Sequence, residues 1–132
     1  MMIMNDDDFP LNIGYMKLAK GVSKFSNHRI KVGAVISGKK PIMACSNKST
    51  SHPLYANGSD LRNSLHAECR AIINSSKNDL NGSTIYVFRE TKKGKPALAM
   101  PCKFCMDMIK KVGIKKVYFT VESFPYYSWL RV

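Results

Sequence analysis

Acidic residues are scarce in this chain of 132 residues, where nine Asp and Glu stand against 21 Lys and Arg, for a formal net charge of +12. Three of the acids lie together at positions 6–8, so residues 9–132 carry 21 minus 6, or +15. This excess favours an anionic partner, such as a phosphorylated small molecule, a nucleic acid or an anionic membrane surface, because summed charge steers association. A biased amino-acid composition is the alternative explanation.

Long apolar runs are also missing from the chain. None approaches the roughly 18 residues of a membrane-spanning helix, and the mean hydropathy is −0.20. We therefore expect no membrane span and no membrane partner. Residues 1–8 lack the basic segment of a signal peptide and are expected to be a flexible end. These absences predict a cytoplasmic protein.

Cysteines number only four. In a reducing compartment such cysteines are metal ligands, catalytic thiols or buried apolar residues more often than a disulfide framework. Internal repeats, low-complexity stretches and long linkers are absent, which predicts a single domain over residues 1–132. A domain of this size can bury a core without disulfides.

Apolar periodicity, turn residues and helix caps predict an α/β fold. A helix capped by Asp8 is expected to run to about Phe25, and a hairpin of two inner strands to cover 30–37 and 42–45. A long polar loop over 47–64 leads to the other predicted elements: a helix at 65–77, a strand at 84–88, a helix from Pro101 to about Gly113 and a strand at 116–121. This last part is βαβ-like, which implies parallel strands covered by helices. The tail at 125–132 is too short to assign.

Two short motifs stand at predicted helix starts. Residues 66–68 are His-Ala-Glu, and residues 101–105 are Pro-Cys-Lys-Phe-Cys. Each is weak alone, since His-x-Glu occurs by chance and Cys-x-x-Cys also occurs in redox pairs and zinc ribbons. Together they match the His-x-Glu and Pro-Cys-x-x-Cys signature of zinc nucleobase deaminases.

The chemistry of these residues favours a catalytic zinc site. Cys102 and Cys105 are three residues apart on one helix and face the same way, and the positive helix N-terminus favours their thiolates. His66 adds a third ligand and leaves the fourth tetrahedral position open for water, as in catalytic sites. Glu68 is then predicted to be the catalytic residue that carries protons during loss of ammonia.

With these motifs the chain resembles the cytidine and deoxycytidylate deaminase superfamily over about residues 20–120. Residues 32–36, Val-Gly-Ala-Val-Ile, resemble the first strand of that family, and residues 113–118 resemble the segment after its second motif. The resemblance implies a three-layer α/β/α sandwich around a mixed, roughly five-stranded sheet, one Zn²⁺ per subunit and a homo-oligomer. His66 is similar to the first ligand of the deoxycytidylate, tRNA-adenosine and polynucleotide deaminases, whereas the enzymes of free cytidine usually have Cys there.

The expected substrate contacts are Asn47, Ala67, Pro101 and Arg89. The resemblance gives Asn47 a contact to the sugar, although a turn residue bonded to its own backbone is the alternative. Arg89 ends a predicted strand, where it could pair with a phosphate or with a neighbouring acid or solvent. The basic segment 91–95 could grip a phosphate or form a solvated loop.

Cys69 opens a different interpretation. It lies three residues after His66, so these two residues and the cysteine pair of the second motif could form a closed structural zinc site. The protein would then be a noncatalytic, zinc-stabilised nucleic-acid-binding domain. A small buried helix residue is the other role for Cys69. His28, just before the first strand, is expected at the surface or in a cap, and contact with substrate is the alternative.

These observations predict a hydrolytic deaminase that converts cytosine to uracil, most simply in a deoxycytidine nucleotide such as dCMP. The alternative enzyme is a deaminase of single-stranded DNA or RNA, including tRNA, for which the net charge of +12 is the main argument. The expected partner is therefore a nucleotide or nucleic-acid substrate.

Overall fold

The computed structural model describes residues 12–38, 41–48, 66–75 and 79–132. This part of the chain holds three helices and five strands. None of these three helices is long and apolar enough to cross a bilayer. The elements are α1 Ile13–Ser23, β1 Val32–Ser37, β2 Pro41–Ser46, α2 Ala67–Asn74, β3 Thr84–Arg89, α3 Lys103–Lys111, β4 Lys116–Thr120 and β5 Tyr127–Arg131. Most of the predicted loop over 47–64 lies outside the described residues.

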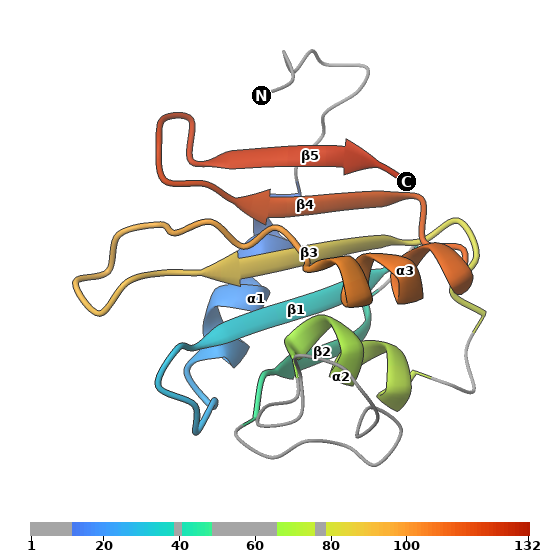
Figure 1. Ribbon diagram of the computed structural model, residues 1–132, viewed down its shortest axis with the longest axis horizontal. Coiled ribbons are helices and arrows are strands. Elements are labelled where there is room, and N and C mark those ends of the chain that lie inside the picture. The colour runs from blue at the N-terminus through green and yellow to red at the C-terminus, as the bar shows by residue number, and fades with distance from the viewer. Residues whose placement is uncertain (1–11, 39–40, 49–65, 76–78) are drawn as a thin grey trace.

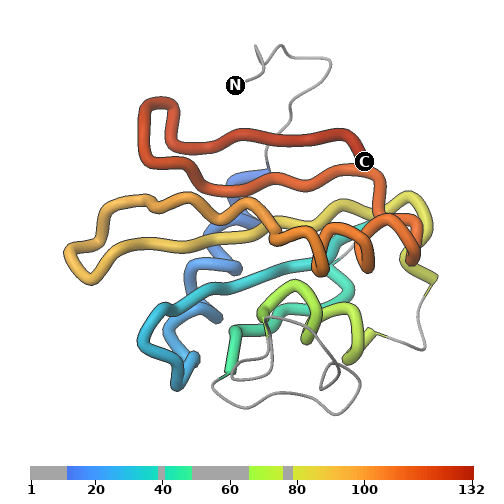
Figure 2. The backbone as a smooth tube through the Cα atoms, in the orientation of Figure 1, coloured from blue at the N-terminus to red at the C-terminus, as the bar shows by residue number. Residues whose placement is uncertain are grey.

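The five strands form one mixed sheet in the order β2-β1-β3-β4-β5. Strand β1 is antiparallel to both β2 and β3, β3 is parallel to β4, and β4 is antiparallel to β5. The parallel pair is joined through α3, which the tube in Figure 2 follows from β3 to β4. The predicted βαβ unit and the mixed five-stranded sheet are therefore confirmed.

Helices cover both faces of this sheet. Ala34 and Ile36 of β1 belong to an apolar cluster that includes residues of α2 and α3. Val35, which points to the opposite face, belongs to a second cluster with Met16 and Ala19 of α1. Figure 1 shows α2 and α3 in front of the sheet and α1 behind it. The predicted three-layer α/β/α sandwich is confirmed.

Two predicted details of the first part of the chain were wrong. Helix α1 begins at Ile13 and is capped by Asn12, whose side chain accepts a hydrogen bond from Tyr15 N at 3.2 Å. Asn caps a helix as well as Asp does, so the predicted cap at Asp8 came too early. Strand β2 is an edge strand, because β1 pairs with β3 on its other side.

The tail that the sequence left unassigned forms β5 at the other edge of the sheet. Trp129 is only 3% exposed there and lies 6.3 Å from the Tyr118 ring of β4, measured between ring centroids. A five-residue strand next to Pro125 carries little local signal, and its pairing with β4 decides its structure.

Helix α1 approaches the sheet most closely at Gly33 of β1. A Cβ atom at this position would lie 1.9 Å from the carbonyl oxygen of Ala19 and 2.9 Å from the backbone nitrogen of Ser23. These are backbone atoms, which cannot move aside as a flexible side chain can. Gly33→Ala is therefore expected to lower the free energy of unfolding by about 3 kcal/mol or more, as measured by denaturant titration.

Gly21 provides the matched control, because it lies inside α1 and a Cβ there would have no atom within 4 Å. Gly21→Ala is expected to raise the free energy of unfolding by about 0.5–1 kcal/mol, through helix propensity alone. Equal effects of the two substitutions would contradict the close packing of α1 on β1.

Candidate metal centre and active site

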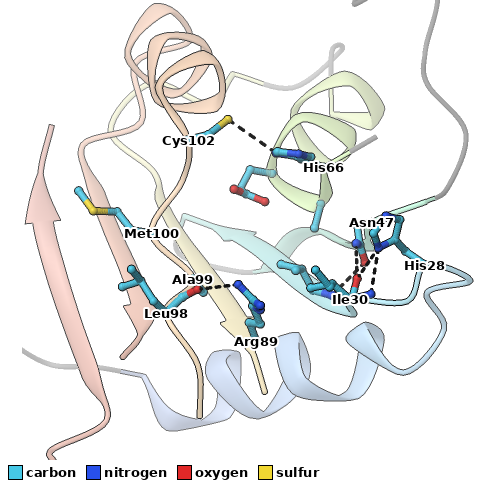
Figure 3. A pocket seen from close by; sticks show the side chains of 12 residues that line it. His28, Ile30, Asn47, His66, Arg89, Leu98, Ala99, Met100 and Cys102 are labelled. Carbon is cyan, nitrogen blue, oxygen red and sulfur yellow. Dashed lines mark hydrogen bonds between the residues drawn. The ribbon is translucent and has the colours of Figure 1, made fainter. Parts of the chain in front are cut away.

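The two sequence motifs meet where helices α2 and α3 begin. His66 is the N-cap residue of α2 and makes no side-chain capping bond, so its ring is available to the site. Cys102 is the N-cap residue of α3, and its sulfur accepts a hydrogen bond from Cys105 N at 3.5 Å. Figure 3 shows His66 and Cys102 pointing toward each other from these helix starts.

The side chains of His66, Cys102 and Cys105 can hold one metal ion. His66 Nδ1 lies 3.7 Å from the sulfur of Cys102 and 3.5 Å from the sulfur of Cys105. The ligand atoms of all three residues lie within 4.8 Å of one another. One imidazole nitrogen and two thiol sulfurs are donors that Zn²⁺ prefers, and three protein donors leave a tetrahedral ion one open position.

Cys69 lies outside this ligand group. It is fully buried in α2, with its sulfur 2.9 Å from the sulfur of Cys105. Among the described residues, the mutually close donor atoms come from His66, Cys102 and Cys105 and not from Cys69. The geometry therefore favours the open site over the closed four-ligand site, and the expected role of Cys69 as a small buried residue fits its placement.

The two motif thiols have opposite pKa shifts in the metal-free site. The side-chain hydrogen bond with the Cys105 thiol lowers the pKa of Cys102 to about 4, and the bond with His66 lowers it further against the effect of burial. The same bond with Cys102 raises the pKa of Cys105, as do its contact with Cys69 and its burial. Burial opposes the charged form of His66, but the bond with Cys102 and the charge of Glu68 leave its pKa raised. Metal binding to both sulfurs must therefore release a proton.

Glu68 lies in the first turn of α2 and is only 5% exposed. Burial raises the pKa of its carboxyl group, because the charged form loses its hydration. The positive end of the helix dipole limits that cost. A buried carboxyl group with a raised pKa, next to candidate metal ligands, is suited to take up and return a proton.

The raised pKa of Glu68 predicts a loss of stability as pH increases. The contribution of Glu68 to the free energy of unfolding is fully present below its unfolded-state pKa of 4.5. It is lost as pH rises through the higher pKa of the folded state. In the metal-free protein, Glu68→Gln is expected to raise the melting temperature more at about pH 7 than at about pH 4. Glu122→Gln, at an exposed position, serves as the control for thermal unfolding at both pH values. An equal gain for Glu68→Gln at the two pH values would contradict the burial argument.

A cavity of about 220 Å³ opens beside Glu68 and the candidate ligands. Three of the predicted substrate contacts, Asn47, Ala67 and Arg89, line it, whereas Pro101 is buried without lining it. The remaining lining residues, apart from His66, Glu68 and Cys102, are His28, Ile30, Val32, Leu98, Ala99 and Met100, several of which Figure 3 labels.

Asn47 braces the backbone at the cavity wall. Its Nδ2 donates to the carbonyl oxygen of Ile30 at 2.6 Å, and its Oδ1 accepts from Val32 N at 2.9 Å. These bonds join the end of β2 to the start of β1, fifteen or more residues away, so Asn47 is not a local turn residue. Its contact with the sugar of a substrate stays a prediction.

Arg89 reaches the cavity from the end of β3. One of its N–H groups donates to the carbonyl oxygen of Leu98 at 3.5 Å, which is long for a hydrogen bond. A guanidinium group has five N–H donors, so most of them remain for an anionic ligand.

The segment 98–100, which the sequence did not assign to the site, reaches it through a contact with a distant part of the chain. Ala99 N donates to the carbonyl oxygen of Thr120 in β4 at 3.0 Å, which places the segment 98–100 along the cavity. His28 Nδ1 accepts from Ile30 N at 3.0 Å, a capping role as expected, and its ring also lines the cavity. No local pattern marks such residues, because their position depends on tertiary pairing.

A known family covers most of this chain. The sequence profile described as "Cytidine and deoxycytidylate deaminase zinc-binding region" matches residues 12–121, which include both motifs. This chain belongs to the cytidine and deoxycytidylate deaminase family. The description of the profile names a zinc-binding region, and the ligand group of His66, Cys102 and Cys105 supplies the donors that zinc requires, so Zn²⁺ is the cofactor that this site fits.

One curated deaminase is similar in sequence to about half of this chain. Deoxycytidylate deaminase of Mycobacterium phage D29 is 33% identical over 69 residues, which are 52% of this chain and 46% of the relative. The match thus spans about half the length of this curated relative.

Solved structures of deaminases share the fold over nearly the whole chain. The dCMP deaminase of cyanophage S-TIM5 in apo form is 28% identical, with a TM-score of 0.64 over 92% of this chain and 88% of that one. Its complex with dCMP and dUMP gives 25% identity and a TM-score of 0.63, over 92% and 86%. The cytidine deaminase of Burkholderia pseudomallei is 16% identical with a TM-score of 0.67, over 91% of each chain, which shows a common fold alone.

Proposed function

We propose that this protein is a zinc-dependent hydrolytic deaminase that converts the cytosine of a deoxycytidine nucleotide to uracil, with dCMP as its smallest good substrate. The observation that carries the proposal is the buried Glu68 carboxyl group beside a His-Cys-Cys ligand group, at the wall of a 220 Å³ cavity. Water and a cytosine base enter this reaction, and ammonia and uracil leave it.

In the proposed site His66, Cys102 and Cys105 hold the zinc ion. When bound, zinc supplies Lewis-acid chemistry, which makes a nucleophile available from water at about neutral pH. Three protein ligands, rather than four, support a catalytic role over a structural one. This also speaks against a noncatalytic zinc-stabilised nucleic-acid-binding domain.

Glu68 moves the protons in the proposed mechanism. Its carboxylate takes a proton from the attacking water and returns it to the ring nitrogen of the base, and the carboxyl group later assists the departure of ammonia. Val32, Ala67 and Leu98 form an apolar part of the cavity wall against which a base can pack.

Two observations favour a nucleotide as the substrate: the substrates named for the phage relatives, and a cationic side chain at the cavity wall. The phage relatives are deaminases of deoxycytidylate, and one was solved with dCMP and dUMP. Arg89 supplies a cationic group with spare donors at the cavity wall. A polynucleotide is the second candidate substrate, supported by the net charge of +12.

The test is to incubate the zinc-loaded protein with cytidine, dCMP, adenosine, single-stranded DNA and tRNA, and to measure ammonia. We expect dCMP to be converted to dUMP and cytidine to be a poor substrate. Salt separates the candidates, since binding to a single strand should fall by roughly 0.7 log unit per log unit of salt for each neutralised phosphate. Absence of ammonia from every cytosine substrate would overturn the proposal.

The cytoplasmic location, expected from the sequence composition, stays a prediction. The homo-oligomer, expected from the family resemblance, also stays a prediction.

A further inference from the structure

A second and larger cavity, of about 560 Å³, lies beside the reaction cavity. Its walls come from the segment between α1 and β1 and from the segment that follows β3, which lie at the same end of the sheet in Figure 2. The lining residues are Ser23, Lys24, Arg29, Ile30, Lys31, Arg89, Glu90, Thr91 and Lys92.

This second cavity is strongly cationic. Five of its lining residues carry a positive charge and one, Glu90, a negative charge, so the formal sum is five minus one, or +4. A terminal phosphate carries about −1.5 to −2 near neutral pH. A single phosphate therefore neutralises about half of the charge, and two phosphates match it.

Several of these cationic groups are available to a ligand. Lys24, Arg29 and Lys92 are exposed, and in the part of the chain that the structure describes their charged groups have neither a hydrogen bond nor an ion pair. Lys31 differs, because its ammonium group donates to the carbonyl oxygen of Ser26. Charged side chains crowded around one hollow repel each other, and an anion relieves that repulsion.

The second cavity adjoins the reaction cavity. Ile30 and Arg89 line both, with Arg89 at their common wall. A ligand that reaches from a base beside Glu68 into the cationic hollow therefore passes Ile30 and Arg89. A ligand bound in this way must carry phosphate beyond the nucleoside itself.

We propose that the cationic cavity binds a second phosphate group of the substrate, so that this enzyme prefers deoxycytidine compounds with at least two phosphates to dCMP. The proposal rests on the deaminase function proposed above. The second phosphate has two chemical sources, the diphosphate of a nucleotide and the flanking phosphate of a single strand. Both present negatively charged phosphate oxygens to the Lys24 and Lys92 side chains, as a terminal phosphate in the nucleotide and as a singly charged diester in the strand.

The test compares the kcat/KM of the zinc-loaded protein for dCMP, dCDP and a single-stranded trinucleotide with a central deoxycytidine. For wild type we expect a kcat/KM about tenfold higher for at least one of the two larger substrates than for dCMP. The double substitution Lys24→Ala and Lys92→Ala should reduce that ratio to about one. Which larger substrate shows the gain identifies the source of the phosphate.

The double substitution Lys110→Ala and Lys111→Ala is the matched control, because these two exposed lysines lie in the last turn of α3 and line neither cavity. It should keep the wild-type ratio, which separates local binding from a change in overall charge. A wild-type ratio near one, or a ratio that the double substitution leaves unchanged, would overturn the proposal.

Calorimetry with inorganic pyrophosphate distinguishes this proposal from the one on which it rests. Wild type should bind pyrophosphate about tenfold more tightly than the double variant does. If no cytosine compound releases ammonia and pyrophosphate still binds in this way, the deaminase function fails while the cationic site stands. If pyrophosphate binds equally to both proteins, the cationic site fails whatever the deaminase assay shows.

Discussion

Glu68→Gln should lower kcat for cytosine deamination by about 10²–10⁴-fold, the usual contribution of a positioned acid–base group. The amide has the shape of the carboxyl group but can neither take up nor return a proton. Because Glu68 lies outside the His-Cys-Cys ligand group, the variant should keep its zinc. Ammonia release and zinc content, measured on the same preparation, check both parts of this expectation.

Glu122→Gln is the control for Glu68→Gln, since it makes the same chemical change at an exposed position. It should leave both kcat and zinc content unchanged. A Glu68→Gln enzyme that retains more than about a tenth of wild-type kcat would show that another group carries the proton. Such a result would remove Glu68 from the mechanism while leaving the zinc site intact.

Cys105→Ala should remove both zinc and activity, whereas Cys69→Ala should remove neither. The two thiols make an unusually close comparison, because both are fully buried and their sulfurs are 2.9 Å apart. Only Cys105 has a sulfur in the ligand group with His66 and Cys102. With two protein donors left, zinc would be bound too weakly to persist through gel filtration.

The measurement is zinc per chain after gel filtration, together with deamination of dCMP. A Cys69→Ala protein that loses its zinc would identify Cys69 as a ligand and restore the closed structural site. The truncation also leaves a small cavity in the core, so a modest loss of thermal stability is expected for Cys69→Ala. This loss of thermal stability should occur without a change in zinc content.

The metal site could be predicted from the sequence because its donors sit at local signals. His66 and Cys102 each mark a helix start, and the spacing of Cys102 and Cys105 brings their sulfurs to one side. Glu68 follows His66 by two residues, so the helix start that places the histidine in the site also brings the carboxyl group close to it. Local geometry therefore fixed most of the chemistry.

The substrate cavity could not be predicted in the same way. Ile30 and the segment 98–100 reach its wall only through bonds to Asn47 and Thr120, across 17 and 21 residues of sequence. The edge position of β2 and the existence of β5 depend likewise on strand pairing, which periodicity along one strand does not encode. The contact of Pro101 with substrate stays a prediction, because its neighbours Met100 and Cys102 line the cavity while Pro101 itself is buried.

X-ray absorption at the zinc K-edge tests the open catalytic site most directly, since it counts the atoms around the ion. We predict two sulfur atoms at about 2.3 Å and two nitrogen or oxygen atoms at about 2.0–2.1 Å, from Cys102, Cys105, His66 and one position open to solvent. Three sulfur atoms and one nitrogen would place Cys69 on the metal. That result would contradict the deaminase site.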